Sequence, residues 1–142
     1  MMNHIKLLES KYACFKAVKW AKDYPSFESA WNACHRSDWM LWIAKKLNVD
    51  KRKLTLAKGK CAETVIHLMK DQRSIDAVKA AIAYGNGEID DVQLKIAADA
   101  ADVVDVAYAA YAAARKENQR KTADICREIL TDEILTASGH NE

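Results

Sequence analysis

The sequence predicts an all-α protein, a compact helical bundle of about six helices in a single domain over residues 1–142. Three observations predict it. Apolar residues recur with helical spacing along most of the chain, and no useful length alternates apolar and polar residues as a half-buried strand does. Four glycines and one proline leave few positions at which a helix must stop. Half of the residues are hydrophobic, which suffices for a buried core at this length.

Proline and serine mark the helices at the start of the chain. The first helix should run over about 5–24, because Pro25 disfavours helical geometry at the residue before it. Ser26 is placed to cap a short second helix, and Ser37 is placed to cap a third. The third helix, 38–44, is apolar on almost every side, so it should lie at the centre of the bundle.

A fourth and a fifth helix follow. Asp50 is placed to cap the fourth, and Ser74 to cap the fifth. The apolar stripe of the fourth helix consists of Leu54, Ala57, Cys61, Val65 and Leu68. The Gly-Asn-Gly sequence at 85–87 should end the fifth helix, since glycine readily adopts the left-handed conformation that follows a helix.

Alanine dominates the next part of the chain. Ten of the eighteen residues over 97–114 are alanine, the best helix former. No glycine or proline interrupts residues 90–135, and one helix of that length would be about 70 Å long. Such a helix is longer than a compact domain of 142 residues is wide, so we expect a break near residues 116–118. The tail from about residue 138 should be loose.

Charge is distributed unevenly along the chain. Residues 1–60 hold thirteen Lys and Arg against five Asp and Glu, a net +8, whereas residues 61–142 hold nine against fifteen, a net −6. A basic patch consists of Lys45, Lys46, Lys51, Arg52, Lys53, Lys58 and Lys60. The charges form either two solvated faces or a polar surface that docks a charged partner. The basic patch has no interleaved aromatic residues and the second half is acidic, which argues against a nucleic-acid partner.

Composition points to the cytoplasm. No run of about eighteen apolar residues is present, so no membrane partner is expected, and the first ten residues lack the apolar core of a secretion signal. Four cysteines fall in predicted helices, far apart and without a Cys-x-x-Cys motif, and we interpret them as buried free thiols. Neither Cys34 with His35 nor Cys61 with His67 has zinc-ligand spacing, so no metal or other cofactor is predicted.

Motifs that carry catalysis do not occur in the sequence, which has no glycine-rich phosphate loop and no nucleophile elbow. Asp99, Asp102 and Asp105 are spaced three apart, as in carboxylate pairs that hold magnesium. That spacing spreads them over about 120° of a helix, so they cannot all face one site. Tyr108 and Tyr111 continue the same spiral, either as hydrogen-bonding residues at the edge of the core or as contacts for a partner. An enzyme is therefore the less favoured class.

The four tryptophans, Trp20, Trp31, Trp39 and Trp42, are interpreted as core residues. Aromatic residues at helical spacing pack a bundle more often than they line a ligand site. Trp39 and Trp42 are three residues apart on the central helix, so each is expected to anchor different neighbours.

Arg127 lies among apolar residues of the last predicted helix, so we expect it to be partly buried and paired with Asp38 or Asp124. In a second interpretation, Arg127 binds a carboxylate or phosphate of a ligand. A small-ligand or enzyme site would then lie between the helix of Trp39 and Trp42 and the helix of Asp124 and Arg127.

Two parts of the chain, residues 13–47 and 97–130, resemble a family of small alanine-rich helical proteins of bacteria and phages known as immunity proteins. The resemblance is carried by Ala13-Cys14, Trp20, Ala30-Trp31-Asn32-Ala33-Cys34, Asp38-Trp39-Met40-Leu41-Trp42, the Ala/Asp/Tyr tract and Ala123-Asp124-Ile125-Cys126-Arg127-Glu128-Ile129-Leu130. The resemblance implies a helical binder that neutralises a toxin rather than an enzyme, and it supplies no catalytic residues.

The leading hypothesis is a cytoplasmic, non-enzymatic inhibitor that binds another protein: a toxin or, for a phage protein, a host or defence protein. The alternative is a nucleotide- or metabolite-binding protein or enzyme. Association of identical chains stays open. Besides the basic patch, the candidate contact residues are Asp38, Trp39, Trp42, Asp99, Asp102, Asp105, Tyr108, Tyr111, Asp124 and Arg127.

Overall fold

A computed structural model describes residues 3–100 and 116–139, and over these ranges the chain is helical without a β-strand. The described residues form eight α-helices and one 3₁₀ turn: α1 (His4–Ser10), α2 (Phe15–Ala21), α3 (Phe27–Ala33), α4 (Ser37–Lys46), α5 (Lys51–Glu63), η1 (Ile66–Leu68), α6 (Gln72–Gly85), α7 (Asp91–Ala100) and α9 (Lys116–Ala137). The predicted all-α class is confirmed, with more helices than expected. None of these helices combines the length and the hydropathy that crossing a membrane requires.

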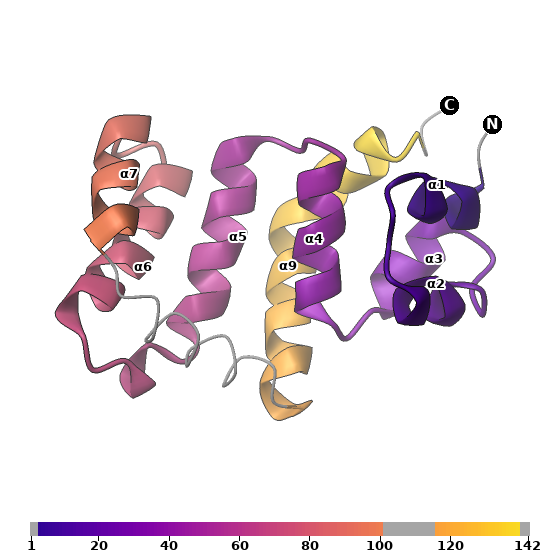
Figure 1. The fold of residues 1–142 in the computed structure, drawn as a ribbon, viewed down its shortest axis with the longest axis horizontal. Helices are drawn as coiled ribbons and strands as arrows, with labels where there is room; N and C mark the ends of the chain where they lie inside the picture. Colours follow the sequence, from indigo (N-terminus) through magenta and orange to yellow (C-terminus); the bar gives the residue numbers. More distant parts are fainter. Residues whose placement is uncertain (1–2, 101–115, 140–142) are drawn as a thin grey trace.

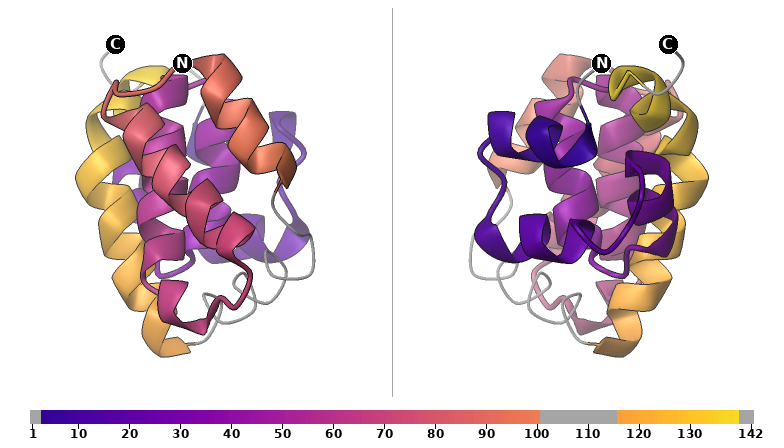
Figure 2. Two further views of the ribbon diagram at one scale, coloured as in Figure 1. Left: turned by 90° about the vertical axis from the view of Figure 1, so that its left-hand side faces the viewer. Right: turned by 90° about the vertical axis from the view of Figure 1, so that its right-hand side faces the viewer.

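The helices lie side by side in a row (Figure 1). At one end α7 packs on α6 and α6 on α5, while α1, α2 and α3 form the other end. The last helix, α9, packs on α3, α4 and α5, and it runs along one edge of the molecule in both end views (Figure 2). This helix therefore holds together three elements from the first half of the chain.

Two of the predicted helix caps are confirmed. The Ser26 hydroxyl accepts a hydrogen bond from the backbone N–H of Ser29 over 3.1 Å, at the start of α3. The Asp50 carboxylate accepts one from the N–H of Lys53 over 3.0 Å, at the start of α5. Each side chain satisfies a donor that the first turn of a helix leaves without a backbone partner.

The predictions for Ser37 and Ser74 were wrong, because both serines lie inside a helix and are buried. Asp71 caps α6 instead, accepting from the N–H of Arg73 over 2.9 Å. Ser37 receives a hydrogen bond from the buried hydroxyl of Thr122 on α9 over 2.8 Å. A serine near the start of a helix can cap the helix, or it can lie in the first turn with its hydroxyl buried. Its presence alone therefore does not show which residue is the cap.

The predicted helix over 5–24 is interrupted after Ser10, and the prediction of one continuous helix was wrong. Tyr12 has a φ of 61°, in the left-handed region. The N–H of Tyr12 donates to Glu9 and that of Ala13 to Leu8, which is the Schellman pattern that ends helices. His4 Nε2 lies 3.0 Å from the carbonyl oxygen of Ala21, so α1 and α2 fold back on each other.

The expected end of the fifth helix is confirmed at Gly87, whose φ is +79° and whose N–H donates to Tyr84. The N–H of Glu88 donates to Ala83, which completes a second Schellman pattern. Here glycine adopts the left-handed conformation without the steric cost that a β-carbon adds.

Residues 91–137 are not one straight helix, because α7 packs on α6 while α9 packs on α3, α4 and α5. The tract is therefore not one helix, but the break predicted near residues 116–118 is not found there, because α9 runs without interruption over Lys116–Ala137. The residues between α7 and α9 lie outside the described part of the chain. Most of the alanine-rich tract lies outside the described residues, and so do Asp102, Asp105, Tyr108 and Tyr111.

The main core lies where α4, α5 and α9 meet. Ala44, Ala57 and Leu130, one from each helix, have no exposed surface. Alanine at two of these positions lets the helices approach closely. A smaller cluster of Val65, Met69 and Val78 lies between α6 and the turn that precedes it.

Candidate functional site

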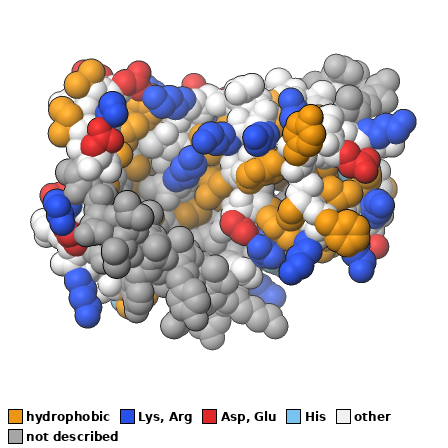
Figure 3. All heavy atoms as spheres, in the orientation of Figure 1, with side chains coloured by type: hydrophobic (Ala, Val, Ile, Leu, Met, Phe, Trp, Pro, Cys, Tyr) orange, Lys and Arg blue, Asp and Glu red, His pale blue; other side chains and the backbone are white. Residues whose placement is uncertain are grey.

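An open hollow of about 70 Å³ lies among α1, α2, α3 and α4. All four tryptophans of the chain line it, and nearly all of its wall is apolar. On the face seen in Figure 3, hydrophobic side chains gather over this end of the molecule, with Lys and Arg side chains around them. We call this feature the aromatic hollow.

The interpretation of the tryptophans as core residues holds for Trp31 alone. Its side chain is 4% exposed, and its Nε1 donates to the hydroxyl of Thr131 on α9 over 2.9 Å. Trp20, Trp39 and Trp42 pack against the core but are only half-buried, and all of them face the aromatic hollow. Three large indoles therefore keep part of their surface open to solvent.

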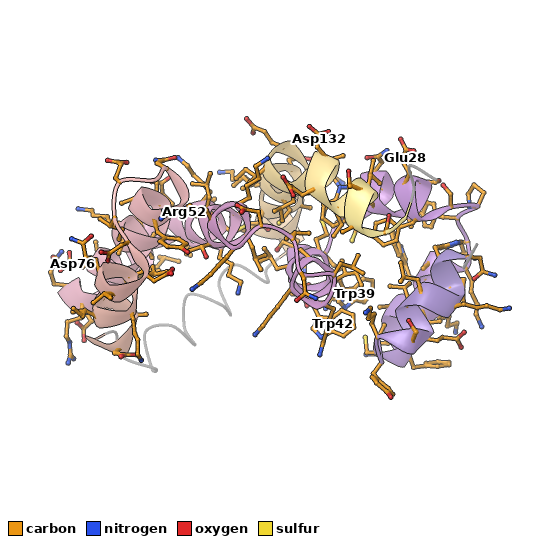
Figure 4. All side chains as sticks on the ribbon, turned by 90° about the horizontal axis from the view of Figure 1, so that it is seen from above. Glu28, Trp39, Trp42, Arg52, Asp76 and Asp132 are labelled. Carbon is orange, nitrogen blue, oxygen red and sulfur yellow. The ribbon has the colours of Figure 1, made fainter. Side chains whose placement is uncertain are left out.

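Helix α4 has two apolar faces, which explains why its sequence is apolar on almost every side. Met40, Ile43 and Ala44 are buried in the core. Trp39 and Trp42 point from α4 toward the end of the molecule formed by the first helices (Figure 4). The helix is central, as predicted, but one of its faces is only partly covered.

Aromatic contacts fix the walls of the aromatic hollow. The ring centroids of Trp20 and Trp39 are 5.9 Å apart at 57°, a tilted arrangement that aromatic pairs prefer. Phe27 stacks on Trp31 with centroids 6.4 Å apart. The Trp20–Trp39 pair joins α2 to α4, and the Phe27–Trp31 pair holds two side chains of α3 together. The shape of the hollow is therefore fixed before any partner binds.

Cations lie directly on two of the indoles. The guanidinium of Arg36 is 4.4 Å from the ring centroid of Trp39, and the ammonium of Lys46 is 5.7 Å from that of Trp42. Arg36 also donates two hydrogen bonds to Asp38, over 2.9 and 2.7 Å. Partial burial acts to raise the pKa of Asp38, but the hydrogen bonds and charge of Arg36 outweigh it and lower that pKa.

Two apolar side chains stand exposed beside the hollow. Tyr12 is 91% exposed and Phe15 is 77% exposed, and they flank Ala13 and Cys14, which line the hollow. Large exposed apolar side chains next to an apolar depression are typical of an interaction surface.

Arg127 is partly buried and paired with Asp124, one of the two partners that the sequence offered. Its Nη2 lies 2.7 Å from Asp124, and its Nη1 donates to the carbonyl oxygens of Cys34, over 2.6 Å, and Trp31, over 3.2 Å. Arg127 thus supplies donors at the end of α3, where a helix leaves carbonyl groups without helical partners, and the Trp31 carbonyl also accepts from the N–H of Cys34. Asp38 pairs with Arg36 instead.

The alternative site expected between α4 and α9 does not form in the described part of the chain. Met40 and Ala44 from α4 and Cys126 and Leu130 from α9 fill that interface, each 1% exposed or less. Trp39 and Trp42 line the aromatic hollow. Arg127 is engaged by Asp124 and by the carbonyl groups of Trp31 and Cys34, and within the described ranges it forms no hydrogen bond or cation–π contact with the indoles of Trp39 and Trp42.

The basic patch is divided rather than continuous. Lys51 pairs with Asp91 over 3.2 Å, Lys53 with Glu133 over 3.1 Å, and Lys60 with Glu63 over 3.8 Å. Arg52 donates to the carbonyl oxygens of Tyr84 and Ile89, so it joins α5 to the end of α6. Within the described ranges, Lys45, Lys46 and Lys58 form no ion pair, and Lys45 and Lys46 follow Trp42 on α4.

The remaining candidates are less informative. Asp99 pairs with Lys95 over 3.0 Å on the exposed face of α7. Cys34, Cys61 and Cys126 are buried free thiols as predicted, whereas Cys14 is exposed, which corrects the prediction for that residue. No group of three or more potential metal ligands occurs among the described residues.

Sequence reasoning missed Arg36, Tyr12 and Phe15 as parts of the site. The spacing of Arg36 and Trp39, three residues apart, is the one signal that could have indicated Arg36. Comparisons with protein-family models, curated proteins and solved structures return no match.

Proposed function

We propose that this protein is a cytoplasmic, non-enzymatic inhibitor that binds another protein through the aromatic hollow. The observation that carries the proposal is the convergence of four tryptophans from α2, α3 and α4 on one open apolar depression. Tryptophan is among the residues most enriched where binding energy concentrates in protein interfaces. A large apolar side chain of the partner would enter the hollow.

The size of the hollow favours a protein partner over a nucleotide or a larger metabolite. Sites for such ligands bury most of the ligand's surface and orient the ligand with a few precisely placed polar groups. The aromatic hollow encloses about 70 Å³, which suits a single side chain. Its wall also offers few polar groups to orient a ligand: His4 Nε2 is already engaged with the carbonyl of Ala21.

The surroundings of the hollow support the same proposal. Exposed Tyr12 and Phe15, with Arg36 stacked on Trp39, give the surface the composition of an interface core. Because aromatic contacts hold the hollow open, little ordering would oppose binding. Inhibition of a toxin, or of a host or defence protein, is what the sequence resemblance to immunity proteins adds to this picture.

The test is a selection of displayed random peptides on the folded protein, with a variant in which the hollow is filled. Ala17 lines the hollow on α2, so Ala17→Leu places a larger side chain in it and keeps a good helix former. Ala98→Leu, on the exposed face of α7, is the matched control. Circular dichroism and the melting temperature establish that both variants are folded.

We expect peptides that bind the natural protein and Ala98→Leu but not Ala17→Leu. Where a toxin gene adjoins this gene, co-expression should restore growth and Ala17→Leu should abolish the rescue. Failure to obtain any peptide whose binding depends on Ala17 would remove the proposal.

A small apolar ligand in the same hollow is the second candidate, favoured by its apolar wall. A preformed apolar cavity can bind benzene-sized molecules. Indole and benzene should then raise the melting temperature of the natural protein and leave that of Ala17→Leu unchanged.

A further inference from the structure

We infer that the partner segment that enters the aromatic hollow is acidic: a short stretch with one large apolar side chain and carboxylates on both sides of it. This inference rests on the proposed function and specifies the chemistry of the partner.

Charge separates the two ends of the row of helices. Residues 3–46, which build the hollow, carry eight Lys and Arg against four Asp and Glu, a net +4. Residues 71–99, which build α6 and α7 at the other end, carry three against six, a net −3. The residues that build the hollow therefore carry a net positive charge, and Lys and Arg side chains lie around the hydrophobic ones at this end of the face drawn in Figure 3.

Cations flank the hollow on two sides. On α4, the ammonium of Lys46 lies over Trp42, and Lys45 precedes it, without an ion pair for either among the described residues. On α2, Lys16 and Lys19 are exposed, each next in sequence to a residue that lines the hollow. A segment seated in the hollow would thus meet positive charge on either side of its apolar side chain.

The positive charge of Lys45 also acts on Lys58, a lysine of α5. Desolvation and then the positive charge of Lys45 lower the pKa of Lys58 on α5. Neither Lys45 nor Lys58 forms an ion pair within the described ranges, and their combined positive charge favours the approach of an anionic group.

A single-stranded nucleic acid also combines negative charge with flat rings, but the tryptophans offer it little free ring surface. Arg36 and Trp20 lie against Trp39, Lys46 lies over Trp42, and Phe27 stacks on Trp31. Bases bind by stacking on open aromatic faces, whereas an aliphatic or aromatic side chain can contact ring edges. The arrangement therefore favours a protein segment.

Three synthetic peptides without tryptophan test the inference. One has a central leucine between glutamates, the second the same leucine between lysines, and the third a central alanine between glutamates. Because all four tryptophans line the hollow, the intrinsic fluorescence of the protein reports its occupancy. Protection of Cys14, the exposed cysteine that lines the hollow, from iodoacetamide is the second readout.

We expect the glutamate-flanked leucine peptide to bind at least about tenfold more tightly than either of the others, with an affinity that falls as salt rises. The double variant Lys45→Glu, Lys46→Glu should weaken that binding by about tenfold or more. Lys79→Glu, on the exposed face of α6, is the control and should have little effect. Two further measurements test other occupants of the hollow. Binding of a single-stranded oligonucleotide is measured with the same readouts, and self-association of the protein is measured by sedimentation.

Equal binding of the glutamate- and lysine-flanked leucine peptides would overturn the inference, and so would binding of the oligonucleotide in the hollow. Concentration-dependent self-association that protects Cys14 would assign the hollow to a second copy and overturn it as well. If displayed peptides depend on Ala17 but are not acidic, the proposed function stands and this inference fails. If no displayed peptide depends on Ala17, both fail.

Discussion

Arg127 on α9 donates a hydrogen bond of 2.6 Å to the carbonyl oxygen of Cys34, the residue that follows α3. The same guanidinium reaches the carbonyl of Trp31 and the carboxylate of Asp124, with only 19% of the side chain exposed. One side chain thus fixes the end of the helix that carries Trp31 into the aromatic hollow.

Replacing Arg127 with alanine should lower the free energy of unfolding by about 1–3 kcal/mol, because the Cys34 carbonyl loses the donor that Arg127 supplies and the Trp31 carbonyl keeps only the N–H of Cys34. Arg127→Lys should recover part of the lost free energy of unfolding, because lysine can donate hydrogen bonds but lacks the planar guanidinium that reaches several acceptors at once. Arg120→Ala, exposed on the same helix, should change stability by no more than about 0.5 kcal/mol. Urea unfolding measures all three, and equal losses in Arg127→Ala and Arg120→Ala would contradict the assigned role.

Gly85 permits the close approach of α5 and α6. A β-carbon on Gly85 would lie 2.9 Å from Leu56 Cα and 2.4 Å from Leu56 Cβ. Gly85→Ala should therefore destabilise the fold by about 1–3 kcal/mol, since backbone must move to make room. At Gly87 nothing lies within 4 Å, and asparagine tolerates its positive φ, so Gly87→Asn should cost clearly less in the same unfolding measurement.

Cys14 should be the single cysteine of the folded chain that reacts rapidly with a thiol reagent. Cys34, Cys61 and Cys126 are buried. Burial raises the pKa of Cys34, and a hydrogen bond with Cys61 together with burial raises the pKa of Cys126, so these two thiols form little reactive thiolate. The hydrogen bond with Cys126 lowers the pKa of Cys61, and burial keeps the reagent from that thiol. A kinetic trace should show one fast equivalent that Cys14→Ser removes, and the other three should react only after denaturation.

Acidification should loosen the contact between α6 and α7. The Tyr84 hydroxyl donates to Asp91 over 2.6 Å and Lys51 donates over 3.2 Å, and these two partners lower the pKa of Asp91. Because the pKa of Asp91 is lower in the folded chain, ionised Asp91 adds to the free energy of unfolding at pH values above its unfolded pKa of about 3.9. This added stability is lost as the pH falls through the pKa of Asp91 in the folded chain. The hydrogen bond to Asp91 also raises the pKa of Tyr84. The contribution of this hydrogen bond to stability is therefore present below about pH 10 and is lost as the Tyr84 hydroxyl ionises above it.

The stability difference between the natural protein and Asp91→Asn measures this contribution. It should be constant between about pH 5 and pH 9 and shrink on both sides of that window. A difference that stays constant down to about pH 2 would show that Asp91 contributes no linked proton.

Sequence reasoning located helix ends that depend on residues with one local role. Asp50 caps a helix and Gly87 ends one, because their chemistry suits those positions, whereas serine caps α3 at Ser26 but lies inside a helix at Ser37 and Ser74. It failed at Tyr12, since a tyrosine gives no sign that it will adopt a left-handed φ when the tertiary contacts of α1 and α2 require it.

The candidate site could not be predicted for the same reason. The tryptophans were recognised as a group, but whether they are covered depends on where α1 and α2 lie. The turn at Tyr12 folds α1 back on α2, and both helices then line the hollow instead of extending past α4. A spacing pattern records which residues share a helix face, and it does not record what covers that face.

The central position of α9 has a consequence for synthesis. A ribosome completes α3, α4 and α5 before it begins α9, yet Trp31, Ala44 and Ala57 acquire their buried surroundings only when α9 packs on them. During that interval the nascent chain presents an apolar surface without its cover, a state that is prone to aggregation. Slow translation between α5 and α9 would lengthen this exposure and increase the dependence of the newborn chain on chaperones.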